Sequence, residues 1–124
     1  MSGNLTKMSI RFVLLVLGFA VAAGAAGTEA TVHGWVLDSA CAYTKGLSKP
    51  ISPECAVACA KKGSPLVILA DDGSIYLPIA DQMPAVGQND RLMPYAGKRV
   101  SATGKTYERS GGRAIVLEKI EAAR

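Results

Sequence analysis

The chain has 124 residues, a formal net charge of +4 and 49% apolar residues, with one His and three Cys. This length provides a single domain, and the composition excludes a two-domain enzyme, a multi-span membrane protein and a disordered chain. Residues 1–26 contain 17 of the apolar residues, including both Phe. The remaining part is about 45% apolar, which is an ordinary value for a globular domain.

The N-terminal segment has the pattern of a secretory signal peptide. Two basic residues precede an apolar run over residues 12–23, and small residues follow. The run is shorter than the roughly 18–20 residues that cross a bilayer. We therefore expect residues 1–26 to be cleaved, with a cut possible from Ala25 up to Ala30. Residues 27–124 are then one periplasmic or extracellular domain without a membrane span.

The basic residues of this domain indicate a solvated surface. From Thr31 onward there are 12 Lys and Arg against 9 Asp and Glu. The basic residues occur as isolated pairs, Lys61-Lys62 and Lys98-Arg99, and not as a stripe that follows a nucleic-acid backbone. Few aromatic residues are present to stack on bases. We therefore expect no nucleic-acid partner.

Short apolar segments bounded by turn residues predict five strands. They lie at residues 31–38, 66–70, 75–79, 100–107 and 114–120. The second segment is continuously apolar, which is typical of a strand that is buried on both faces. Pro78 cannot donate a hydrogen bond to a ladder, so the third strand either ends there or lies at a sheet edge.

Two turns join these strands into hairpins, Asp71-Asp72-Gly73-Ser74 and Ser110-Gly111-Gly112. Their Gly, Asp and Ser residues suit tight turns, and this explains the adjacent carboxylates of the first turn without catalysis. Gly34 and Gly104 lie inside strands, where glycine indicates a bend or a bulge. Five short and strongly bent strands predict a small OB-like barrel.

One short capped helix is predicted between the first two strands. Ser52 can cap it, Pro53 suits its first position, and Gly63 suits its end. A helical turn is expected over residues 90–96, where Pro94 keeps it short. The expected fold class is therefore mainly β: a small five-stranded OB-like barrel with one short capped helix and a helical turn.

Four motifs extend over nearly all of residues 27–124. They are Gly34-Trp35-x-x-Asp38-x-x-Cys41, Glu54-Cys55-x3-Cys59-x3-Gly63, Gly73-x-Ile75-Tyr76 and Tyr95-Ala96-Gly97-Lys98-x-Val100-x3-Gly104. Together they resemble a largely uncharacterised group of small secreted bacterial proteins that is similar to OB-fold domains. The resemblance implies an OB-like barrel and export, but no particular activity. Such sequences have a His at the position of Tyr95, so a ligand role of that His is not carried over.

The three cysteines are the most informative residues for chemistry. On a helix, Cys55 and Cys59 share a face, but a spacing of four seldom allows a disulfide without distortion. Cys41, on a flexible stretch before the helix, can reach either one. An exported chain with three cysteines is expected to form one bridge from Cys41 and leave one thiol. Closing about 15 residues contributes on the order of 3 kcal/mol.

The two helical cysteines differ in their expected reactivity. Cys55 lies in the first helical turn, where free N–H groups and the helix dipole stabilise a thiolate. If either helical cysteine reacts, Cys55 is favoured. Cys59 lies a turn later, and it can also pack as a small apolar residue that never reacts.

A metal or thiol-redox site is the alternative for the same cysteines. Four soft or borderline ligands that suit copper or zinc are available from Cys41, Cys55, Cys59 and His33. Met83 and Met93 are possible additional thioether ligands. An oxidising compartment argues against free thiols unless a metal or a reductase protects them. A lone His on a strand is also more typical of a surface or core position.

No catalytic set of residues is recognisable. The single His has no partnered serine motif, and no glycine-rich phosphate loop follows a strand. We therefore expect no enzyme, but an exported binding or interaction module that a disulfide stabilises and that needs no cofactor. Its contact surface is expected to include the strand face of Trp35 and Tyr76, together with Tyr95. Its partner would be an envelope protein or a small ligand.

Overall fold

A computed structural model describes residues 27–48 and 50–124. In these residues five strands close into a barrel in the order β1-β2-β3-β5-β4. The strands are β1 (Thr28–Asp38), β2 (Leu66–Ala70), β3 (Ile75–Pro78), β4 (Arg99–Arg109) and β5 (Gly112–Ala122). Neighbouring strands are antiparallel except for β3 and β5. The mainly β, OB-like barrel expected from the sequence is confirmed. The predicted signal peptide lies outside the described residues.

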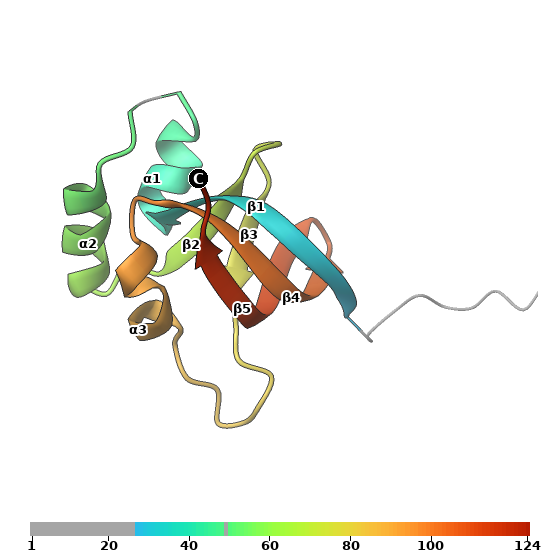
Figure 1. The fold of residues 1–124 in the computed structure, drawn as a ribbon. Helices are drawn as coiled ribbons and strands as arrows, with labels where there is room; N and C mark the ends of the chain where they lie inside the picture. The colour runs from blue at the N-terminus through green and yellow to red at the C-terminus, as the bar shows by residue number, and fades with distance from the viewer. Residues whose placement is uncertain (1–26, 49) are drawn as a thin grey trace, which may run out of the picture.

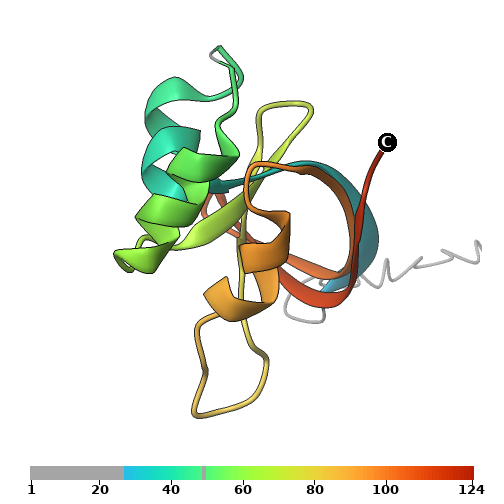
Figure 2. The same ribbon diagram turned by 60° about the vertical axis from the view of Figure 1, so that its left-hand side comes forward.

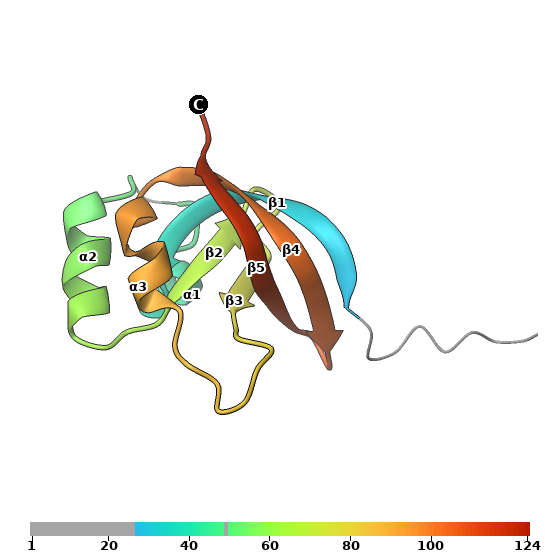
Figure 3. The ribbon, with the colours of Figure 1, turned by 60° about the horizontal axis from the view of Figure 1, so that its bottom comes forward.

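The helical segments gather at one end of the barrel (Figures 1 and 3). They are α1 (Ser39–Lys45), α2 (Pro53–Lys61), α3 (Asn89–Leu92) and the 3-10 turn η1 (Met93–Tyr95). Figure 2 shows α1 and α2 side by side, both within the connection between β1 and β2. Within residues 27–48 and 50–124, no helix has the length and apolar character needed to cross a membrane.

Apolar residues on alternate positions of the strands fill the barrel. β2 is buried along its whole length, as its continuous apolar run predicts. Its alternate residues point to opposite faces, so Ile68 joins the barrel core while Val67 and Leu69 join a smaller cluster outside it. The outer cluster contains Leu37, Ala42, Val67 and Leu69, with Trp35, Ile51 and Ile75 packed against it. This cluster attaches the helical connection to the barrel.

The two glycines inside strands lie where backbones approach each other too closely for a side chain. A Cβ at Gly34 would lie 2.2 Å from the Leu69 carbonyl oxygen, and one at Gly104 would lie 2.0 Å from the Val116 carbonyl oxygen. β1 changes its pairing partner from β4 to β2 at Gly34, and the β4–β5 register shifts beside Gly104. The predicted bend and bulge are confirmed.

The helices agree with the sequence in two places and differ in one. α2 begins at Pro53 with Ser52 as its cap, whose hydroxyl accepts the Cys55 N–H at 3.2 Å. The expected turn at residues 90–96 is present as α3 followed by η1. The expectation that Cys41 lies on a flexible stretch is wrong, because Cys41 is in helix α1, which Asp38 caps.

Candidate functional site

Asp38 lies at the centre of the helical end of the barrel. It ends β1, and its Oδ2 accepts the Cys41 N–H at 3.2 Å, which starts α1. The residue is only 1% exposed. Its other oxygen, Oδ1, is buried without a hydrogen-bond partner among the described residues. A buried carboxylate oxygen without a partner is costly, and such groups point to a special role.

The carboxylate of Asp38 borders a small cavity between α1 and α2. This cavity has a volume of about 80 Å³. The polar and thiol side chains on its wall come from both helices and from the segments that precede them: Asp38, Cys41, Lys45, Ser52 and Cys55. Cys41 and Cys55, which are 14 positions apart in the chain, therefore face the same space.

The environment of Cys41 favours its thiol form. A hydrogen bond to the Asp38 carboxylate, assisted by burial and by the charge of that carboxylate, raises the pKa of the Cys41 thiol to about 11. Cys55 adds a smaller effect in the same direction, and the Lys45 ammonium opposes it. Cys41 is half-buried. It is therefore a poor nucleophile unless a base removes its proton.

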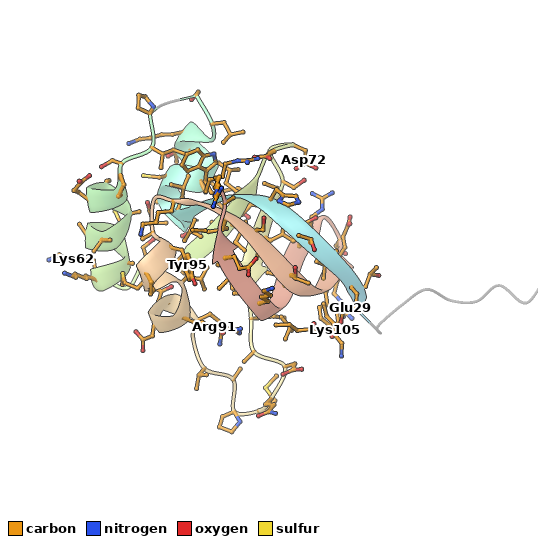
Figure 4. All side chains as sticks on the ribbon, in the orientation of Figure 1. Glu29, Lys62, Asp72, Arg91, Tyr95 and Lys105 are labelled. Atoms are coloured by element: carbon orange, nitrogen blue, oxygen red, sulfur yellow. The ribbon has the colours of Figure 1, made fainter. Side chains whose placement is uncertain are left out.

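Cys59 lies on the other side of Asp38. It borders a shallow hollow of about 350 Å³ together with Asp38, Ala58, Lys62 and Ser64. Burial, and then the Asp38 charge, raise the pKa of the Cys59 thiol, and a hydrogen bond with Cys55 acts in the same direction. Lys62, at the end of α2, points away from the barrel (Figure 4). Asp38 is thus the common neighbour of both half-buried thiols.

Cys55 is the accessible thiol of the three. It is exposed, whereas Cys41 and Cys59 are half-buried, and all three are unpaired in the structure. Its backbone N–H is capped by Ser52, which places the residue in the first turn of α2, as expected. The expected disulfide from Cys41 is not formed in the structure. The structure does bring the three cysteines of the sequence analysis to one end of the molecule, around a carboxylate.

His33 is not part of this cluster. It lies five residues before Asp38 on β1, which corresponds to about 16 Å along an extended strand. Its Nδ1 is 2.9 Å from the Ser101 hydroxyl, on the exposed face of the β1–β4 pair. In the part of the chain that the structure describes, no three His, Cys, Asp or Glu residues are arranged to hold a metal ion. Met83 is exposed and Met93 packs against the core.

The aromatic residues expected on a contact surface do not share one face. Trp35 packs against the outer cluster, whereas Tyr76 packs against the barrel core. The expected common strand face of Trp35 and Tyr76 is therefore corrected, because their positions point to opposite sides of the sheet. Tyr95 packs against the core, and its hydroxyl donates to the Ile120 carbonyl at 3.2 Å. All three are at least partly used in packing.

A second surface has the character of a contact site. A groove of about 730 Å³ runs along the segment between β3 and α3. Leu77, Met83 and Val86 line it and are 43%, 83% and 68% exposed. In Figure 1 this segment extends away from the barrel, beside α3 and apart from α1 and α2. Large apolar side chains exposed together are typical of interaction surfaces.

Sequence reasoning named Asp38 only as part of a motif, without a role, and did not single out the groove. The signal for Asp38 was its position directly before Ser39, since Asp is a preferred helix cap. The signal for the groove was the run of apolar residues in a segment without a strand or helix pattern. Comparison with known protein families, curated proteins and solved structures finds no match to this chain.

Proposed function

We propose that the protein is an exported binding module whose helical end is held by a disulfide between Cys41 and Cys55. The observation that carries this proposal is the small cavity that both cysteines line. Cys59 borders a different hollow, and its spacing of four from Cys55 disfavours a bridge within one helix. The leftover thiol is therefore Cys59.

The size of the outer cluster supports the need for such a bridge. Of the four buried residues in this cluster, only Ala42 comes from α1, and Ile51 of the following segment packs against the cluster. A core of this size supplies little stabilisation for the segment that joins the two helices. A Cys41–Cys55 bond closes a loop of about 15 residues and contributes on the order of 3 kcal/mol.

The groove between β3 and α3 is the surface that supports a binding role. It lies apart from the cysteine cluster, so the bridge and the contact surface are separate features. Its exposed residues Leu77, Met83 and Val86 suit an apolar segment of an envelope protein or an apolar small ligand. Asp90 is the one carboxylate among the described lining residues, and it has no nucleophile beside it in the groove, which fits binding without catalysis.

The test is to express the full chain in a bacterium, purify the protein from the periplasm and determine its mass, N-terminus, free thiols and metal content. We expect one free thiol at Cys59 and a Cys41–Cys55 peptide pair. We also expect processing after Ala25 or Ala26. A cut after Ala30 would remove residues 28–30, which pair with β4.

Serine variants identify the pairing. The C59S variant should have no free thiol and should unfold at the same urea concentration as the wild type. The C41S variant should lose the bridge and unfold at a lower concentration. Three free thiols with stoichiometric copper or zinc would overturn the proposal in favour of a metal site. A protein retained in the cytoplasm would overturn its export.

A further inference from the structure

We propose that Cys41 and Cys55 form an exchangeable dithiol–disulfide site that reacts with disulfides of other exported molecules, with Asp38 as the proton acceptor for Cys41. The inference rests on the proposed Cys41–Cys55 bridge and adds a reaction to it. Three features carry it: the different exposure of the two cysteines, the buried oxygen of Asp38, and the cavity that joins all three residues.

The exposure of the two cysteines assigns their order of reaction. Cys55 is exposed in the first turn of the nine-residue helix α2. Substrates therefore meet Cys55 first. Cys41 is half-buried and lines the same cavity, so we assign it the second step, the attack on the sulfur of Cys55. This order corresponds to a nucleophilic cysteine and a resolving cysteine.

The buried oxygen of Asp38 is an independent observation that points to the same site. In the dithiol form, the interaction of the Cys41 thiol with this carboxylate is the main reason that the pKa of Cys41 is raised. In the disulfide form this interaction is lost, while the carboxylate remains buried. Asp38 therefore favours the dithiol form and makes the bridge easier to reduce.

The reaction balances without a further reagent. The Cys55 thiolate attacks a substrate disulfide R–S–S–R′, so that a Cys55–S–S–R bond forms and R′S⁻ leaves. Asp38 then takes the proton of the Cys41 thiol, and the Cys41 sulfur attacks Sγ of Cys55. The Cys41–Cys55 bond forms and RS⁻ leaves, so two electrons pass from the two cysteines to the substrate. The protons released by the cysteines neutralise the two substrate thiolates. In reverse, the bridge oxidises a dithiol.

The charged and titratable groups around Cys41 agree with this assignment. Asp38 from the end of β1, Lys45 from α1, and Cys55 from α2 face it. The Lys45 ammonium acts to lower the pKa of Cys41, so it stabilises the negative charge that the Cys41 sulfur gains when its proton passes to Asp38. Cys59 is on the other side of the carboxylate and does not line the cavity, so it is not required for the exchange.

The D38N variant tests the role of the carboxylate, because asparagine can still cap α1 while it cannot accept the proton. The full chain is equilibrated with reduced and oxidised glutathione, and the bridge is quantified after acid quenching and alkylation. We expect D38N to shift the equilibrium toward the disulfide by about tenfold, which is equivalent to about 30 mV. We also expect the mixed disulfide at Cys55 to accumulate, because its resolution is slower.

Three further variants make the result specific. C41S should trap glutathione on Cys55, C59S should react like the wild type, and D72N, in an exposed turn, should leave both readouts unchanged. A peptide disulfide used in place of oxidised glutathione distinguishes a polypeptide substrate from a small thiol by its relative rate. If D38N fails to fold, C41S still tests the order of attack.

The outcomes separate the two proposals. A Cys41–Cys55 bridge that does not exchange with glutathione or with the peptide overturns the inference and leaves the proposed function intact. Glutathione trapped on Cys59, or D38N indistinguishable from the wild type in both readouts, also overturns the inference. The absence of any Cys41–Cys55 bridge overturns the proposed function itself.

Discussion

Asp38 uses its two carboxylate oxygens in different ways. Oδ2 caps α1 through the Cys41 N–H, so it is part of the framework. Oδ1 is buried without a partner beside the thiols, which makes it costly for stability. One residue thereby couples the start of a helix to the protonation of the cysteine in its first turn.

The alkylation of the reduced protein tests this coupling at the residue scale. At pH 8 a thiol with a pKa of about 11 has about 100-fold less thiolate than a thiol with the ordinary pKa of 9.0. We therefore expect Cys41 to react with iodoacetamide far more slowly than Cys55, as measured by peptide mass spectrometry over time. The rate at Cys41 should rise with pH until about pH 11.

Unfolding in urea provides the control for alkylation, because it separates the Cys41 thiol from the Asp38 carboxylate. Both cysteines should then react at similar rates. Equal rates in the folded protein would contradict the assigned interaction.

The raised pKa of Cys41 also makes the free energy of unfolding depend on pH. As the pH rises, the Cys41 thiol loses its proton in the unfolded state before it does so in the folded state. The stabilisation from this thiol is complete below about pH 9 and is lost as pH rises through about 11.

At the scale of elements, the strands were predictable because their signals are local. The continuous run of β2 and the turn residues at its end depend on neighbouring residues alone, and both are present in the structure. Helix α2 was predictable for the same reason, because its start and end are marked locally by Ser52, Pro53 and Gly63. The internal glycines predicted bends, although the identity of the contacting backbones is set by the barrel's closure.

Helix α1 and its site were not predictable in the same way. The residues Tyr43 and Thr44 have weak helix propensity, and the seven-residue helix follows β1 without a loop. In the sequence, the capping residue Asp38 is therefore indistinguishable from the last residue of the preceding strand. The gathering of Cys41, Cys55 and Cys59 around this carboxylate depends on how α1 and α2 pack together, which no local pattern contains.

Gly34 provides a test of the strand arrangement. In G34A the added methyl group would overlap the Leu69 carbonyl, so β1 and β2 have to separate. We expect a destabilisation of about 1–3 kcal/mol from this overpacking, measured by urea unfolding. Gly87 is the matched control, because a Cβ there has open space. G87A should be neutral or slightly stabilising, and equal effects of the two variants would contradict the bend at Gly34.

At the scale of the whole molecule, the two candidate surfaces occupy separate regions. The cysteine cluster is between α1 and α2, and the apolar groove is beside α3 (Figures 1 and 2). A partner in the groove would leave Cys55 accessible. Glu29 and Lys105 lie together at the opposite end of the barrel (Figure 4), where a hydrogen bond to Glu118 raises the pKa of Glu29.

The groove is tested by removing its exposed apolar side chains. We expect the double variant M83S/V86S to bind an apolar fluorescent dye more weakly than the wild type, with its stability changed by less than about 0.5 kcal/mol. Y43S, which alters an exposed residue of α1, is the control. Unchanged dye binding in the double variant, or a comparable loss in Y43S, would show that the groove is not the apolar contact surface.

The closure of the barrel depends on its shortest strand. β3 has four residues and pairs with β5 only over residues 76–78, whereas β4 and β5 pair along eleven-residue strands. Local opening therefore begins at this seam, and hydrogen exchange should be fastest there among the ladder amides. Opening frees the edges of β3 and β5, and free edges are templates for strands of another molecule. Self-association of destabilised variants should thus start at β3 and not at the helical end.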